Sequence, residues 1–194
     1  MQLRLRPASK INMTFNTRKT VCMVFNSASR SKRVADSFPV FTLCNSDCVR
    51  SMFRLIFADQ FKYLGHIVDN SFSDDSDINR EVKALFARTN LLCRRFKRCS
   101  KPVKVRLFRS FCVCFYNTAL WCNYFVGAIS RLASCYNKCL KYFFGYSKYS
   151  SVTDMLLELG LPSFNTLIHN YNVSFARLSA CDSVLVQRVL QFNL

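Results

Sequence analysis

Two adjacent carboxylates at residues 74 and 75 are the first groups in this chain whose type and spacing could do chemistry. The stretch FSDDSDINREV covers residues 72 to 82, and Asp74-Asp75 is the only Asp-Asp pair in the sequence. Paired carboxylates can hold the divalent ions that stabilise the attacking and leaving oxygens in phosphoryl transfer. The neighbouring residues decide between a metal site and a structural role for this pair.

The local pattern favours the start of a helix over a metal site. Residues 72–75 match the F/Y-x-D-D tetrad of polymerases that copy RNA, where the acids lie on a tight hairpin between two apolar strands. Here a helical pattern follows at once, and acids at a helix start stabilise it by about 0.5–2 kcal/mol. We therefore interpret Asp74, Asp75 and Asp77 as capping residues. The related stretch FADQ, at 57–60, offers a single carboxylate and is also excluded.

The charge distribution points to a polyanionic partner. The chain carries 28 Lys and Arg against 11 Asp and Glu, a formal net charge of +17. From Val82 through Thr153 there are fourteen Lys or Arg and no Asp or Glu. Such a block suits nucleic acid or an anionic membrane surface. A solvated basic face without a partner is the alternative.

Composition indicates one globular domain, or a piece of a larger one, with reduced cysteines. The 194 residues are 51% hydrophobic, enough for a core, and 4 Gly with 4 Pro argue against a turn-rich all-β fold. Eleven cysteines without a secretory signal favour free thiols in the cytosol or nucleus. The pairs Cys44/Cys48 and Cys135/Cys139 have poor metal spacing, so buried thiols are favoured over structural zinc.

The hydrophobic periodicity predicts an α+β fold with strands first and helices after. Strand-like apolar runs cover residues 20–26, 38–44 and 61–68, and Gly65 either breaks the last run or allows a close backbone approach. Helical spacing begins at Asp74. We expect helices over about 74–96, from 101 onward, and over 130–144, 151–160 and 164–178. The predicted domains are therefore residues 1–73, with short strands, and residues 74–194, with helices.

Each of the first three predicted helices carries an apolar stripe, and flanking residues mark the ends of several helices. The first stripe contains Ile78, Val82, Leu85, Thr89, Leu92 and Phe96. The second contains Val103, Leu107, Phe111 and Phe115, and the third contains Leu132, Cys135, Cys139 and Phe143. Pro102 suits a first turn, Gly145 a helix end, and Ser151 with Asp154 a capping box.

A membrane span is the main alternative outside nucleic-acid binding. Residues 110–130 contain no charge, and this length suffices for the ~30 Å core of a bilayer. However, Asn117 and Asn123 would need hydrogen-bond partners in lipid, and the stripe from Val103 to Phe115 crosses the boundary without a break. We therefore favour a core helix with no membrane partner.

Six segments, taken in order, resemble a known family. They are FNTRKTVCMVFN (15–26), FKYLGHIV (61–68), DDSDINREVKALFARTNLLCRRFKRCS (74–100), VKVRLFRSFC (103–112), YNKCLKYFFGY (136–146) and SVTDMLLELGLPSF (151–164). Together they resemble the C-terminal end of the reverse transcriptase domain of LINE-type (non-LTR) retrotransposons, over about residues 11 to 180. The resemblance implies an edge of the polymerase palm in 1–73, made of short antiparallel strands with a primer-grip-like hairpin, and a helical thumb bundle in 74–194.

The resemblance also implies what this chain lacks. Residues 16–20 look like the palm motif whose lysine, here Lys19, approaches the leaving pyrophosphate in the intact enzyme. In the family the Asp-Asp hairpin precedes this motif, so the Mg²⁺-binding carboxylates and the fingers would lie upstream of Met1. We therefore expect no catalytic residue, metal or cofactor in this chain, and no RNA-directed DNA polymerase activity from it alone.

The expected partner is the backbone of an RNA/DNA duplex, held by a hairpin similar to the family's primer grip and by the thumb. The candidate nucleic-acid-binding residues are Phe61, Lys62, Tyr63, Leu64, Gly65, Arg94, Arg95, Lys97, Arg98, Lys101 and Lys104. Three alternatives remain. The thumb could have become a module that packs on a protein partner, the chain could be a retroelement remnant without function, or it could pair with a separate palm and fingers half.

Overall fold

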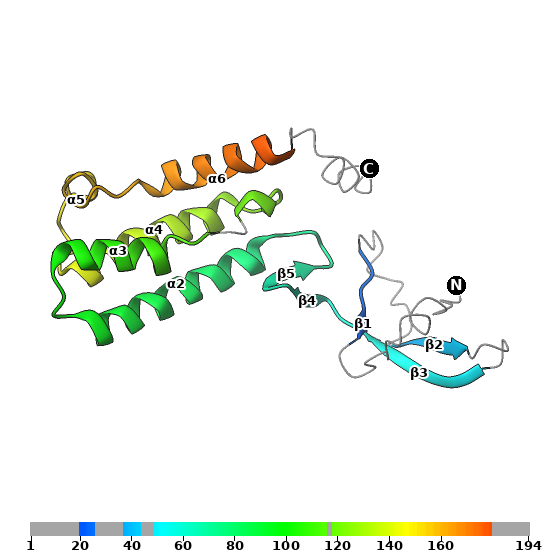
Figure 1. The fold of residues 1–194 in the computed structure, drawn as a ribbon. Helices are drawn as coiled ribbons and strands as arrows, with labels where there is room; N and C mark the ends of the chain where they lie inside the picture. Colours follow the sequence, from blue (N-terminus) through cyan, green and yellow to red (C-terminus); the bar gives the residue numbers. More distant parts are fainter. Residues whose placement is uncertain (1–19, 26–36, 44–48, 116–117, 180–194) are drawn as a thin grey trace. The chain divides into compact units, whose positions relative to one another are not determined.

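The structure, a computed structural model, describes residues 20–25, 37–43, 49–115 and 118–179. The chain is α+β, as the sequence predicted, and it divides into two compact units, residues 1–73 and 74–194. The division falls where the sequence changes from strand-like runs to helical spacing. Strands belong to the first unit and helices to the second (Figure 1).

The first unit contains a three-stranded sheet in the order β1-β3-β2. β2 (Ser37–Leu43) pairs antiparallel with β3 (Val49–Phe57), with an irregularity between Thr42 and Leu43. β1 (Val21–Cys22) is shorter than the predicted strand and pairs parallel with β3, so the expectation of antiparallel strands alone is wrong. β3 was not predicted, because arginines interrupt its apolar alternation in VRSMFRLIF.

A two-stranded hairpin follows, in which β4 (Gln60–Tyr63) pairs antiparallel with β5 (His66–Asp69). The turn residues Leu64 and Gly65 have φ of 47° and 90°. Two consecutive positive φ angles match the hairpin twist, and glycine adopts them without strain. Gly65 therefore breaks the apolar run 61–68 into two strands.

Helices make up the described part of the second unit (Figure 1). They are α2 (Asp75–Phe96), α3 (Lys101–Cys112), the short 3₁₀ turn η1 (Thr118–Leu120), α4 (Val126–Phe144), α5 (Val152–Leu159) and α6 (Phe164–Ser179). α2 and α4 run in the same direction, because residues at their starts and at their middles are in contact. Their facing sides form the core together with Phe108 and Cys112 of α3 and with buried residues of α5, α6 and the loops between the helices.

The predicted stripes of α2 and α4 are confirmed. Ile78, Leu85, Thr89 and Leu92 are buried, while Val82 and Phe96 are half-buried. All four predicted core residues of α4 are buried, and the helix ends at Gly145 with φ of 79°. It begins at Val126, four residues before the predicted start.

The ends of α5 also follow the prediction. The Ser151 hydroxyl accepts a hydrogen bond from the Asp154 backbone N–H at 3.4 Å, and Gly160 closes the helix with φ of 59°. α6 covers the predicted range to within a residue.

The predicted stripe of α3 is confirmed only in part, since Phe115 is buried and Leu107 is half-buried against the core. Val103 and Phe111 are 47% and 50% exposed, whereas Phe108 and Cys112 are fully buried. The helix ends at Cys112, so Phe115 is buried from the loop beyond it. Two overlapping stripes were available in this sequence, and the Phe108 stripe faces the core because its ring packs on Tyr136 and Phe143 of α4.

The uncharged stretch 110–130 is divided between the end of α3, η1 and the start of α4. Among the described residues, no helix has the length and apolarity needed to cross a bilayer.

Candidate nucleic-acid interface

The carboxylate of Asp74 holds the loop before α4. One of its oxygens accepts hydrogen bonds from the backbone N–H groups of Cys122 at 2.8 Å and Asn123 at 2.9 Å. The Asp74 N–H donates in return to the Asn123 carbonyl at 2.8 Å. Asp74 occupies the N-cap position of α2, but its side chain makes no capping hydrogen bond there. The acids do begin a helix, whereas the expected capping role of this side chain is wrong.

The other two acids of this cluster bind the same loop. Asp75 accepts from the Phe125 N–H at 3.0 Å. Asp77 is fully buried, and it accepts from the Trp121 indole at 2.9 Å and from the Arg80 guanidinium at 2.7 Å. These oxygens face N–H donors from a loop and a helix, so the cluster anchors the fold. Within the described ranges, no three His, Cys, Asp or Glu side chains are placed to share a metal ion.

Six cations gather where α2 ends and α3 begins, and we name them the α2–α3 basic cluster. Its members are Arg94, Arg95, Lys97, Arg98, Lys101 and Lys104. The first four are exposed, and no carboxylate of the described residues pairs with them. By contrast, Arg80 and Arg88, which come earlier in α2, pair with Asp77 and Glu81. Exposed unpaired cations also stabilise the C-terminal end of a helix, which is the structural alternative for Arg94 and Arg95.

Lys101 and Lys104 are held by the neighbouring helices. The Lys101 ammonium donates to Glu158 and lies 5.8 Å from the centre of the Tyr146 ring. The hydrogen bond to Glu158 raises the pKa of Lys101. The Lys104 ammonium lies 5.6 Å from the centre of the Phe143 ring. The charge of Lys101 is therefore partly offset by Glu158, whereas Arg94, Arg95, Lys97 and Arg98 have no such partner among the described residues.

These contacts bring the end of α4 to the same end of the helical unit as the basic cluster (Figure 1). Asp74, Asp75 and Asp77 lie at the opposite end, because α2 separates them from the cluster by its full length. The helical unit is thus polarised along α2. Three further lysines lie near this end, namely Lys138, Lys141 and Lys148. They belong to the same acid-free block but were not predicted as nucleic-acid-binding residues.

The hairpin presents its predicted residues to solvent. Phe61, Lys62, Tyr63 and Leu64 are exposed, with Leu64 at the tip 89% exposed, and Gly65 is half-buried. Phe61 and Tyr63 lie on one face of β4 and line a pocket of about 400 Å³ with Val21, Phe25 and other residues of the first unit. Lys19, which the resemblance places near the leaving pyrophosphate, lies outside the described residues.

Comparisons of this chain with protein-family models, with curated proteins and with solved structures find no match.

Proposed function

We propose that this chain is the C-terminal palm and thumb portion of a LINE-type reverse transcriptase domain, and that it binds the backbone of an RNA/DNA duplex. The six segments quoted above support the family. The α2–α3 basic cluster supports the activity, and it is the observation on which the proposal depends.

The cluster has the chemistry of a phosphate-binding surface. Its six cations occur within residues 94–104, and the first four are exposed without a carboxylate partner among the described residues, so their side chains are available to a ligand. Guanidinium groups bind phosphate oxygens through paired, charge-assisted hydrogen bonds, and lysine binds them as a point charge. Contacts of this kind position a protein on a duplex without reading its sequence. We therefore assign the cluster to backbone binding.

The hairpin β4–β5 is proposed to contact the primer strand. Its exposed aromatic residues Phe61 and Tyr63 and the positive φ at Gly65 suit close approach to a sugar–phosphate backbone. This role rests on the resemblance of FKYLG to the primer grip.

No polymerase activity is expected from the chain alone. The carboxylates of Asp74, Asp75 and Asp77 are engaged by N–H donors, and Mg²⁺ binding belongs to carboxylates of the intact family enzyme. A primer-extension assay with Mg²⁺ or Mn²⁺ tests this point. Reproducible synthesis by the pure protein would contradict the proposal.

The binding proposal is tested by the salt dependence of duplex affinity. We would measure fluorescence anisotropy of a labelled RNA/DNA hybrid with the full chain across a salt series. The variant Arg94→Gln/Lys97→Gln/Arg98→Gln should reduce the slope of log K against log salt by about 2–3, because each lost phosphate contact removes about 0.9.

A matched control removes the same charge elsewhere. Lys83, Arg131 and Arg177 are exposed and lie toward the other end of the helical unit. The variant Lys83→Gln/Arg131→Gln/Arg177→Gln should leave the slope near the wild-type value. An equal decrease of the salt slope in the two triple variants would show that net charge alone drives binding, and the assigned site would be wrong.

A protein-interaction module is the second candidate, favoured by one exposed apolar segment. In residues 120–126, Leu120 is 52%, Phe125 77% and Val126 76% exposed. If duplex binding is weak and insensitive to salt, this segment becomes the better candidate surface.

A further inference from the structure

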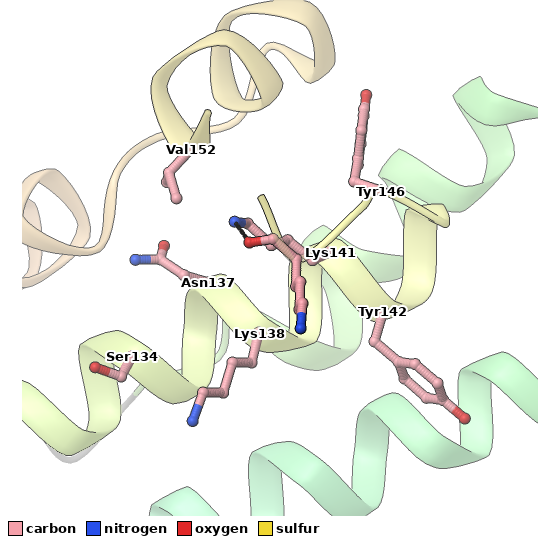
Figure 2. A pocket seen from close by; sticks show the side chains of 8 residues that line it. Ser134, Asn137, Lys138, Lys141, Tyr142, Tyr146 and Val152 are labelled. Atoms are coloured by element: carbon pink, nitrogen blue, oxygen red, sulfur yellow. Dashed lines mark hydrogen bonds between the residues drawn. The ribbon is translucent and has the colours of Figure 1, made fainter. Parts of the chain in front are cut away.

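The second half of α4 and the turn after it line a pocket of about 450 Å³, which we name the lysine pocket (Figure 2). Its lining includes Asn137, Lys138, Lys141, Tyr142, Tyr146 and Lys148. Val152 reaches toward it from α5 in Figure 2. The volume is within the range of small-ligand sites and fits a nucleotide unit.

The lysine pocket is positively charged, because three of its lining residues are lysines and none is acidic. The Lys141 ammonium donates one hydrogen bond to the Lys148 carbonyl at 2.7 Å. An ammonium has three N–H donors, so two remain for a ligand, and the side chain is already held in place. Lys138 is exposed. The arrangement is suited to phosphate oxygens.

Exposed aromatic rings accompany these cations. Tyr142, which lines the pocket, is 63% exposed, and Tyr149, which follows the lining residue Lys148 in the sequence, is 82% exposed with the Lys148 ammonium 4.7 Å from its ring centre. Tyr146 is not available in the same way, because its hydroxyl donates to Glu158 and its ring lies near Lys101. Tyr142 and Tyr149 thus offer exposed aromatic rings close to these lysines.

A purely structural role explains only part of this arrangement. Lysines in the last turn of a helix stabilise its carbonyl end, which accounts for Lys141. Lys138 lies outside that turn, and helix stabilisation requires no exposed tyrosine. Cations combined with exposed aromatic planes are the features with which proteins bind unpaired nucleotides.

We propose that the lysine pocket binds single-stranded nucleic acid, with phosphates at Lys138, Lys141 and Lys148 and an unpaired base stacked on Tyr142 or Tyr149. The bases of a duplex already stack on each other, so the tyrosines favour an unpaired strand. This site uses residues outside the α2–α3 basic cluster and takes a different ligand, and it does not depend on the family proposed above.

The test compares two labelled strands of ten nucleotides, one of thymidines and one abasic, which carry the same phosphates. With the full chain, the thymidine strand should bind more tightly than the abasic strand. The variant Tyr142→Leu/Tyr149→Leu should weaken thymidine-strand binding about 5- to 100-fold and leave abasic binding unchanged, because it removes stacking alone. Tyr124→Leu, at an exposed tyrosine outside the pocket, should bind as the wild type.

The lysine contribution is measured separately. Lys138→Gln/Lys148→Gln should lower the salt slope for both strands by a similar amount. Equal binding of the two strands by the wild type, or an unchanged affinity in the double tyrosine variant, would overturn the inference. Loss of duplex binding in the Arg94/Lys97/Arg98 variant with retained single-strand binding would separate the two sites. If the wild type binds the duplex but not the thymidine strand, the proposal for the lysine pocket is refuted and the proposal for duplex binding stands.

Discussion

The buried indole of Trp121 donates its Nε1 hydrogen to Oδ2 of Asp77 at 2.9 Å, across 44 positions of the chain. The other carboxylate oxygen of Asp77 accepts from Arg80 at 2.7 Å. Asp77 is fully buried and Trp121 is 7% exposed. This contact joins the first turn of α2 to the loop that begins α4, so it should support the whole helical unit.

Removing either side of this contact should destabilise the fold. We expect Asp77→Ala to lower the free energy of unfolding by about 1–3 kcal/mol, because the buried Trp121 N–H loses its acceptor, while the partly exposed Arg80 keeps Glu81 as a partner. Trp121→Phe should cost about 1–3 kcal/mol. Urea unfolding measures both values, and Asp154→Asn, at an exposed acid, should change stability by less than about 1 kcal/mol. Wild-type stability in Asp77→Ala would contradict the assigned role.

Asp74 should protect specific backbone amides instead of binding metal. Asp74→Ala should speed hydrogen exchange at the Cys122 and Asn123 amides by about fivefold, since each loses a hydrogen bond worth about 1 kcal/mol. Asp75→Ala should likewise speed hydrogen exchange at the Phe125 amide. In the same NMR experiment, Mn²⁺ should cause no selective broadening at Asp74 or Asp75. Selective broadening at micromolar Mn²⁺ would restore the metal-site interpretation.

The corrected face of α3 can be tested with two phenylalanines. Phe108→Ala should lower the free energy of unfolding by about 3–5 kcal/mol, because Phe108 is fully buried. Phe111→Ala should cost less than about 1 kcal/mol, since that ring is half exposed. Thermal unfolding of the two variants compares their losses of stability directly. A larger loss in Phe111→Ala than in Phe108→Ala would show that the originally predicted face of α3 is the buried one.

Cysteine reactivity should depend on pH and position. Burial raises the pKa of Cys112 to about 11. At pH 8 only about one thiol in a thousand would be ionised there, and labelling should rise as the pH approaches the pKa. Iodoacetamide should therefore modify the exposed Cys122 first and spare Cys112.

The buried pair on α4 should resist the reagent as well. The hydrogen bond between the two sulfurs is the main cause that raises the pKa of Cys135, and burial raises it further. The same hydrogen bond lowers the pKa of Cys139. Both side chains are nearly inaccessible. Mass spectrometry of native and urea-unfolded samples checks the order, and equal native rates at Cys112 and Cys122 would contradict it.

Much of the helical unit could be predicted because its signals are local. The seam from Ile78 to Phe96 repeats with helical spacing, and Gly145, Ser151 and Gly160 mark helix ends through backbone conformation and one side-chain cap. β3 could not be predicted in this way, because its stability comes from pairing on both sides with β1 and β2. The α2–α3 basic cluster could also be predicted from the sequence, since its six cations lie within residues 94–104.

The sequence by itself determined the α+β order, the excess of positive charge and the start of a helix after the Asp-Asp pair. The tertiary structure alone decided which face of α3 is buried, which donors occupy Asp74, Asp75 and Asp77, and that Lys138, Lys141 and Lys148 line one pocket. The physical reason is the sequence separation over which each interaction acts. Periodicity, caps and net charge act within a few residues, whereas a hydrogen bond from Trp121 to Asp77 forms only after two distant segments have packed together.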